Sequence, residues 1–152
     1  MTDVTSLTER LDRLTSFYEN LTPQTVRNFT RYYAADARFK DPFNDVSGLP
    51  AIERIFSHMF EQVESPRFII TGCYTGTGSV SGEAMLRWEL RFKSRSMGRE
   101  EQCIVGSTLL TFDAAGRVTL HRDYWDAAEE LFSKLPVLGP LTRALRRQLA
   151  TR

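Results

Sequence analysis

The stretch VTLHRDYWD, from Val118 to Asp126, decides the fold that the sequence predicts. It has the form of a strand that runs directly into a final helix. A period of two places His121, Asp123 and Trp125 on one face of that strand. Burying an imidazole beside a carboxylate costs free energy unless the two are paired. We therefore expect this face either to line a polar pocket or to face water.

The composition is that of an ordinary soluble globular domain. The chain has 152 residues, of which 41% are apolar and 26% charged, which suits one domain with its own core. The net charge of +1 gives no general case for a nucleic-acid partner. Two histidines and two widely spaced cysteines argue against a zinc site, so we predict no metal and no cofactor. Without an apolar leader or a bilayer-length run, we expect a cytoplasmic protein with no membrane partner.

The order of periodic segments predicts the fold class. Apolar residues recur at helical spacing over 6–21, from 22 to about 35, and from 50 to about 63. The period then becomes that of strands at 68–77, 83–92, 101–112 and 118–125, with hairpin-like connections between them. We expect an α+β fold in which a curved antiparallel sheet wraps on three N-terminal helices. One domain should span 1–152, with a core at 6–134 and an amphipathic C-terminal helix at 135–152.

The segment expected to form a strand at 83–92 has two unlike faces. Its even-numbered residues are apolar, whereas Arg87 and Glu89 lie on the other face. In one interpretation Arg87 bridges Glu89 and Asp123 inside a pocket, where one carboxylate is a base and the other an acid. In the other interpretation these residues form an ion pair on a solvated face. The apolar face is the more obvious core side, which favours the second interpretation.

Asp41 and His121 also have two interpretations each. Pro42 keeps Asp41 extended at a strand end, where its carboxylate could act in catalysis, hold water or start the next turn. His121 could be a general base next to Asp123, or a histidine at the edge of the core that is hydrogen-bonded to backbone. The residues alone favour the turn and the structural histidine.

The C-terminal helix carries a stripe of leucines at Leu141, Leu145 and Leu149, with arginines elsewhere on its surface. Such a helix could rest on a membrane surface. Docking on the domain or on a second subunit is the more common arrangement, and we favour it here. If the helix mediates dimerisation, truncation after Lys134 should give a monomer.

Two segments resemble the SnoaL-like branch of the nuclear-transport-factor-2-like superfamily. They are ADARFKDPF at 35–43 and HRDYWDAAEEL at 121–131, and the order of elements is also similar. The resemblance implies a cone with a deep, mostly apolar pocket, a small apolar or polycyclic ligand, and a homodimer. It implies that seven residues line the pocket: Phe17, Tyr18, Phe43, Phe56, Thr108, His121 and Trp125.

A first enzyme resemblance is to ketosteroid isomerases. Asp41-Pro42 is similar to the dipeptide that holds the proton-shuttling base of those enzymes. Their oxyanion-hole tyrosine falls at Phe17, beside Tyr18, and their oxyanion-hole aspartate falls at Thr108. This resemblance implies an isomerase with Asp41 as its base.

A second resemblance is to limonene-epoxide hydrolases, at Arg87-Trp88-Glu89 and at RDYWD, residues 122–126. It implies that Asp123 activates water, that Arg87 is the bridge, and that Glu89 protonates the epoxide oxygen. Asp41 would help to hold the water. This assignment requires Arg87 and Glu89 to point inward. The implied function is a pocket for a small lipophilic molecule with acid–base chemistry, and the alternative is a non-catalytic ligand-binding or interaction domain.

Overall fold

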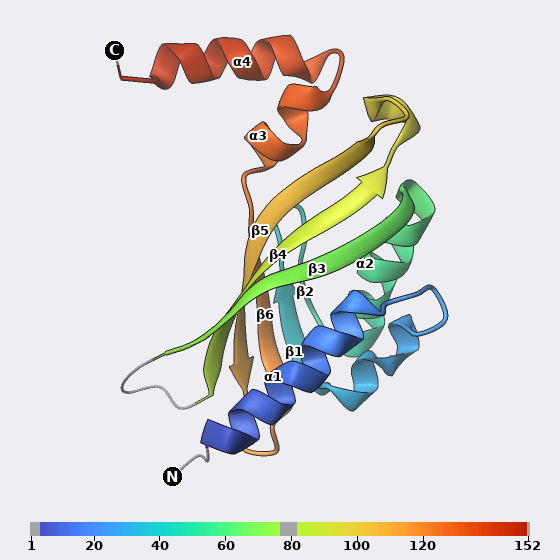
Figure 1. Ribbon diagram of the computed structural model, residues 1–152, viewed down its shortest axis with the longest axis vertical. Helices are drawn as coiled ribbons and strands as arrows, with labels where there is room; N and C mark the ends of the chain where they lie inside the picture. The colour runs from blue at the N-terminus through green and yellow to red at the C-terminus, as the bar shows by residue number, and fades with distance from the viewer. Residues whose placement is uncertain (1–3, 77–81, 152) are drawn as a thin grey trace.

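The computed structural model describes residues 4–76 and 82–151, which form a curved sheet with helices packed on its inner side (Figure 1). Within these residues the sheet has six strands, in the order β2-β1-β6-β5-β4-β3. This confirms the α+β class and the cone. The strand bounds are β1 Tyr33–Lys40, β2 Asp45–Ser47, β3 Glu64–Thr75, β4 Glu83–Lys93, β5 Glu101–Phe112 and β6 Val118–Tyr124.

One strand pairing differs from the purely antiparallel sheet that the sequence predicted. β1 runs parallel to β6, with Phe39 opposite His121, whereas the remaining described pairings are antiparallel. Parallel strands need a long crossover connection, and here it runs through residues 41–117, about half of the chain. β6 therefore lies between β1 and β5, which places His121 and Asp123 in the middle of the sheet.

Two α-helices cover the inner face of the sheet. α1 (Val4–Glu19) packs against β3, and α2 (Leu49–Gln62) packs against β1 and β3. Each helix buries one apolar stripe, in which Leu11, Leu14 and Ile52 are at most 2% exposed. These stripes anchor the helices and close the narrow part of the cone.

The middle helix expected between 22 and 35 is a short 3₁₀ helix, η1 (Val26–Arg31). It ends early because Tyr33 starts β1 and pairs with Val118. Tyr33 is completely buried, so the sheet and the core override the helical spacing of this segment. Because Tyr33 belongs to β1 and not to a helix, its buried side chain lies inside the cone.

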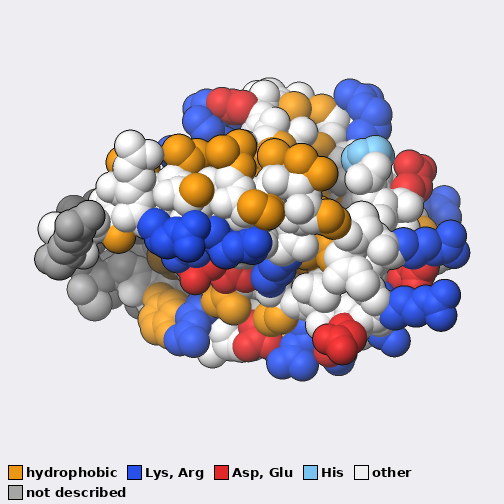
Figure 2. Space-filling model, turned by 90° about the horizontal axis from the view of Figure 1, so that it is seen from above, with side chains coloured by type: hydrophobic (Ala, Val, Ile, Leu, Met, Phe, Trp, Pro, Cys, Tyr) orange, Lys and Arg blue, Asp and Glu red, His pale blue; other side chains and the backbone are white. Residues whose placement is uncertain are grey.

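The C-terminal segment leaves the cone. α3 (Ala127–Glu130), η3 (Phe132–Lys134) and α4 (Leu138–Leu149) follow β6, and α4 projects beyond the sheet at the top of Figure 1. Another short 3₁₀ helix, η2 (Arg95–Met97), lies between β4 and β5. Seen from above, the end of the molecule carries a band of hydrophobic side chains (Figure 2). Across residues 4–76 and 82–151, no helix has both the length and the apolar character to span a membrane.

Candidate functional site

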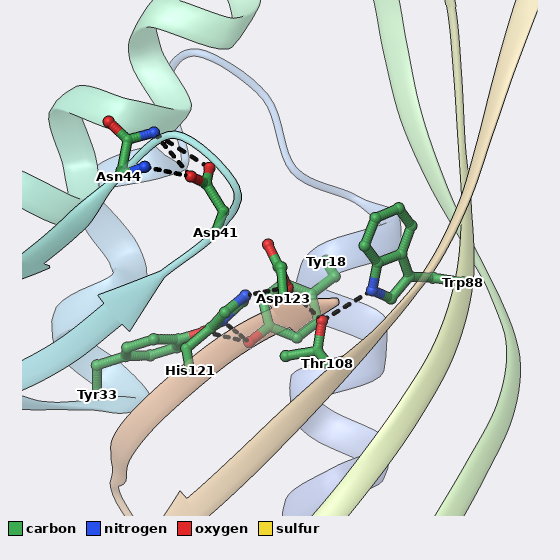
Figure 3. A network of polar contacts seen from close by, with 8 residues as sticks. All are labelled: Tyr18, Tyr33, Asp41, Asn44, Trp88, Thr108, His121 and Asp123. Atoms are coloured by element: carbon green, nitrogen blue, oxygen red, sulfur yellow. Dashed lines mark hydrogen bonds and ion pairs between the residues drawn. The ribbon is translucent and has the colours of Figure 1, made fainter. Parts of the chain in front are cut away.

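Asp123 receives hydrogen bonds from two neighbours inside the cone (Figure 3). Thr108 Oγ1 donates to Asp123 Oδ1 at 2.5 Å, and His121 Nε2 lies 2.8 Å from the same oxygen. Trp88 Nε1 in turn donates to Thr108 Oγ1 at 2.8 Å. Because the indole can only donate, the hydroxyl hydrogen of Thr108 is left for Asp123. One carboxylate oxygen is therefore fixed from both sides.

The other ring nitrogen of His121 faces two buried tyrosines. The Tyr33 hydroxyl lies 2.6 Å from Nδ1 and that of Tyr18 lies 3.3 Å away, and the two hydroxyls are hydrogen-bonded to each other. Burial raises the pKa of both phenols well above its ordinary value, so both stay protonated. If Tyr33 donates to Nδ1, a neutral imidazole carries its hydrogen on Nε2 and donates to Asp123. Each hydrogen bond in the series from Tyr33 through His121 is then donated in the direction of Asp123 Oδ1.

The buried tyrosines predict a loss of stability in alkaline solution. Unfolded tyrosines ionise near pH 10.0, whereas burial raises the pKa of Tyr18 and Tyr33 in the folded protein. The stabilisation is therefore complete below this pH and is lost as the pH rises above it, by about 1.4 kcal/mol per pH unit for each tyrosine. Urea denaturation at pH values below and above 10.0 gives the free energy of unfolding. We expect this free energy to fall less steeply with pH in Tyr18→Phe than in the wild type. Tyr74→Phe, which removes an exposed hydroxyl, is the matched control, and an unchanged slope in Tyr18→Phe would contradict the assignment.

Asp123 also lines a small cavity. Its volume is about 20 Å³. A space of this size holds roughly one water molecule, so it is far smaller than the deep pocket that the resemblance implied. Asp123 Oδ1 takes both hydrogen bonds described above, while Oδ2 has no hydrogen-bond partner among residues 4–76 and 82–151. The cavity is lined by Tyr18, Phe56, Phe68, Ile70, Leu86, Trp88, Thr108, His121 and Asp123.

A much larger hollow lies away from this network. It is an open groove of about 1030 Å³ at the end of α2, bounded by Leu21, Phe60 and Arg95 among others. None of the residues that we predicted to be catalytic or to line the pocket borders this groove. Most polar residues that line the groove are exposed, whereas Thr108, His121 and Asp123 form a largely buried, hydrogen-bonded group at the small cavity. We therefore place the candidate site at Asp123.

The structure places the predicted lining residues in two groups. Tyr18, Phe56, Thr108 and His121 border the small cavity. Phe17 instead stacks on Tyr32 within the core, with ring centroids 4.7 Å apart. Phe43 and Trp125 contact each other with centroids 5.6 Å apart, and Phe43 is 56% exposed. These three aromatic residues pack the cone and its rim without reaching Asp123.

The inward orientation that the hydrolase resemblance implied for Arg87 and Glu89 is wrong. On β4 the even-numbered residues point into the cone, where Leu86 is 1% and Trp88 5% exposed. The strand's alternation therefore turns Arg87 and Glu89 to the outer face. There Glu89 accepts two hydrogen bonds from Arg91, at 2.9 and 3.0 Å. Arg87 forms no bridge to Asp123, as the apolar pattern of β4 had indicated.

Asp41 serves the turn that follows β1. Its carboxylate accepts the backbone N–H of Phe43 at 2.8 Å and of Asn44 at 2.6 Å. The side-chain amide of Asn44 donates to the same carboxylate at 3.1 Å (Figure 3). These bonds stabilise the turn at Pro42, and Asp41 does not line the cavity. The turn interpretation therefore describes its place in the structure.

Sequence reasoning missed Tyr33 and the hydrogen bond from Trp88. No local pattern could have found Tyr33, because it reaches His121 through the parallel pairing of β1 with β6. Trp88 belongs to the apolar face that was expected to be the core side of its strand, and its indole N–H donates to Thr108. The described residues contain no group of three or more His, Cys, Asp or Glu side chains placed to hold a metal.

Comparisons with known proteins agree with this architecture. The sequence of residues 14–121 matches the SnoaL-like domain family. No curated protein sequence matches the chain. A similar solved structure is a hypothetical protein with a ketosteroid isomerase-like fold from Catenulispora acidiphila, in complex with trimethylamine. It is 14% identical, with a TM-score of 0.66, over 84% of this chain and 92% of that chain.

Two further solved structures are similar to this chain. A putative isomerase of the SnoaL-like family from Agrobacterium tumefaciens is 16% identical, with a TM-score of 0.59, over 83% of this chain and 99% of that chain. SalBIII, an epoxide hydrolase/cyclase-like enzyme with a role in pyran ring formation in the polyether salinomycin, is 12% identical. The match has a TM-score of 0.66 and covers 83% of this chain and 95% of that chain. These likenesses confirm the fold that the sequence resemblance implied. Since the domain match spans more than half of the chain, this protein belongs to the SnoaL-like family.

Proposed function

We propose that this protein is a proton-transfer enzyme of the isomerase or cyclase type, with Asp123 as its base. One observation carries the proposal. Asp123 lines a mostly apolar cavity; its Oδ1 is held by Thr108 and His121, while its Oδ2 lacks a hydrogen-bond partner in the described part of the chain. A carboxylate that is fixed through one oxygen can accept a proton on the other.

The chemistry requires one carboxylate that receives a proton and later returns it. Asp123 would remove a hydrogen from a carbon next to a carbonyl group, which leaves an enolate and a protonated Asp123. In an isomerase the same proton returns to another carbon of the enolate. In a cyclase the enolate carbon would add to a second carbonyl carbon of the substrate, and the proton would go to the alkoxide oxygen that this addition leaves. Among the described residues that line the cavity, Asp123 is the single carboxylate, which suits this one-base scheme.

Epoxide hydrolysis is the second candidate, and the name of SalBIII favours considering it. Opening an epoxide with water uses a base for the water and an acid for the leaving oxygen. Glu89, the acid that the resemblance supplied, pairs with Arg91 on the outer face of the sheet. The geometry therefore supports proton transfer at carbon better than hydrolysis.

The proposed ligand is a small lipophilic ketone, for which the cavity must open. Ligand pockets usually measure about 300–1,000 Å³, whereas this cavity measures about 20 Å³. Phe68 and Ile70 are half-buried lining residues on β3, the edge strand of the sheet. β3 pairs with no strand besides β4 in the described sheet, and Ile70 N–H donates to Glu19 Oε1 at 2.9 Å. We propose that this wall moves when the ligand enters.

Hydrogen exchange at carbon tests the proposal without knowledge of the natural substrate. The full chain is incubated in D₂O with cyclic β,γ-unsaturated ketones, and ¹H NMR follows the loss of the α-hydrogens and migration of the double bond. We expect catalysed exchange that is unchanged in Glu89→Gln, because that side chain faces outward. Turnover of terpenoid epoxides that is lost in Glu89→Gln would instead favour the hydrolase. Binding of ketones without any reaction would favour the non-catalytic alternative.

A further inference from the structure

The surface of α4 carries a group of exposed apolar side chains that the proposed function does not use. Leu138, Leu141, Leu145 and Leu149 lie along one side of the helix and are 42 to 84% exposed. Val137, immediately before the helix, is 84% exposed. Together these five residues define the leucine stripe. A contiguous apolar surface of this kind usually marks an interaction site.

The polar side of α4 is the side that faces the rest of the protein. Arg143 donates to the backbone oxygen of Ser133 at 2.9 Å, and Arg146 lies 3.7 Å from Glu129. Gly139, the buried residue of the helix, also lies against Ser133. These contacts hold α4 on η3 and α3 by its polar side and turn the leucine stripe outward. The apolar band seen from above in Figure 2 has basic side chains next to it.

The charge of this segment has one sign. From Phe132 to the end of the sequence the chain contains one lysine and four arginines but no aspartate or glutamate. A second copy that docked through the same stripe would bring two cationic helices together, which repel each other. An anionic bilayer has negative headgroups that complement these charges, and below them an apolar layer that the leucine stripe could enter.

We infer that α4 docks on the surface of an anionic phospholipid bilayer. The leucine stripe would enter the boundary between headgroups and acyl chains, as the apolar face of interfacial helices does. The basic residues of the segment would add electrostatic attraction to the anionic headgroups, while Arg146 also pairs with Glu129. This replaces the expectation of no membrane partner. It concerns a surface distant from Asp123 and does not depend on the proposed enzyme activity.

Vesicle flotation tests the inference with the full chain. We expect the protein to float with vesicles of equal parts phosphatidylglycerol and phosphatidylcholine, more weakly with pure phosphatidylcholine, and less as salt is added. The double variant Leu141→Glu/Leu145→Glu should bind at least about tenfold more weakly, since each leucine contributes apolar area. Its thermal unfolding should match wild type, because both side chains are exposed. Val105→Glu, at a 44% exposed position on β5, is the matched control.

Three results would overturn the inference. The first is the absence of flotation with the anionic vesicles. The second is equal binding by wild type and by Leu141→Glu/Leu145→Glu. The third is a wild-type dimer that the double variant converts to a monomer in sedimentation equilibrium, because a second copy would then cover the stripe.

Discussion

Asp123→Asn is expected to lower the rate of proton transfer by a factor of roughly 10²–10⁴, the usual contribution of a positioned general base. The amide has the shape of the carboxylate but cannot accept the substrate proton. Its oxygen can still accept from Thr108 and His121, so the fold should persist. We therefore expect kcat to fall while affinity for a ketone inhibitor changes little. Exchange of α-hydrogens in D₂O measures the first quantity, and ligand titration measures the second.

The controls for this variant separate a catalytic from a structural role. Glu89→Gln also neutralises a carboxylate, but on the outer face of β4, and it should retain the wild-type rate. Thr108→Val removes one donor to Asp123 Oδ1 and should produce a smaller loss than Asp123→Asn. A rate within a few-fold of wild type in Asp123→Asn would exclude Asp123 as the base.

Gly106→Ala is the second change for which we expect a large effect. Trp88 lies directly across from Gly106 on the neighbouring strand. A Cβ at position 106 would lie 2.5 Å from Cζ2 of the Trp88 ring, which is too close for any real contact. The indole would have to move, although it is 5% exposed and packed in the core. Overpacking of this kind typically costs about 1–3 kcal/mol, which urea denaturation would measure.

The same substitution should also reach the candidate site. Trp88 Nε1 donates to Thr108, and Thr108 donates to Asp123. Displacement of the ring breaks the first of these bonds and frees the hydroxyl of Thr108 to rotate. We expect a lower rate of hydrogen exchange than in Ser107→Ala, the control one residue along the same strand. Stability and rate equal to wild type would show that the ring has room to move.

Local patterns were sufficient for most of the elements but not for their pairing. The strand expected at 101–112 has those bounds in the structure, and the one at 118–125 differs by a single residue. The period of two specifies such strands because one face is buried. The contact between β1 and β6 joins Tyr33 to Val118, and no local pattern determines so distant a pair.

The site was harder to predict because it depends on register. If residues are counted outward from Phe112 opposite Val118, Thr108 falls opposite Arg122. An irregularity between Thr111 and Phe112 shifts the pairing by one residue, so that Thr108 faces Asp123 instead. A shift of one residue exchanges the two faces of a strand. The face of β4 was predictable from its apolar residues, and the hydrolase resemblance misplaced Arg87 and Glu89 because it disregarded that pattern.

The central position of β6 has a consequence for synthesis of the chain. Until β6 has left the ribosome, one edge of β1 and one edge of β5 lack the strand with which they pair in the folded protein. The nascent chain therefore has two unpaired strand edges. The contacts that close the sheet are far apart in sequence, which slows folding because loop-closure entropy is lost before they form. Intermediates with open edges tend to aggregate. The partly synthesised protein should therefore depend on chaperones, and the candidate site should form only in the last folding step, when His121 meets Tyr33.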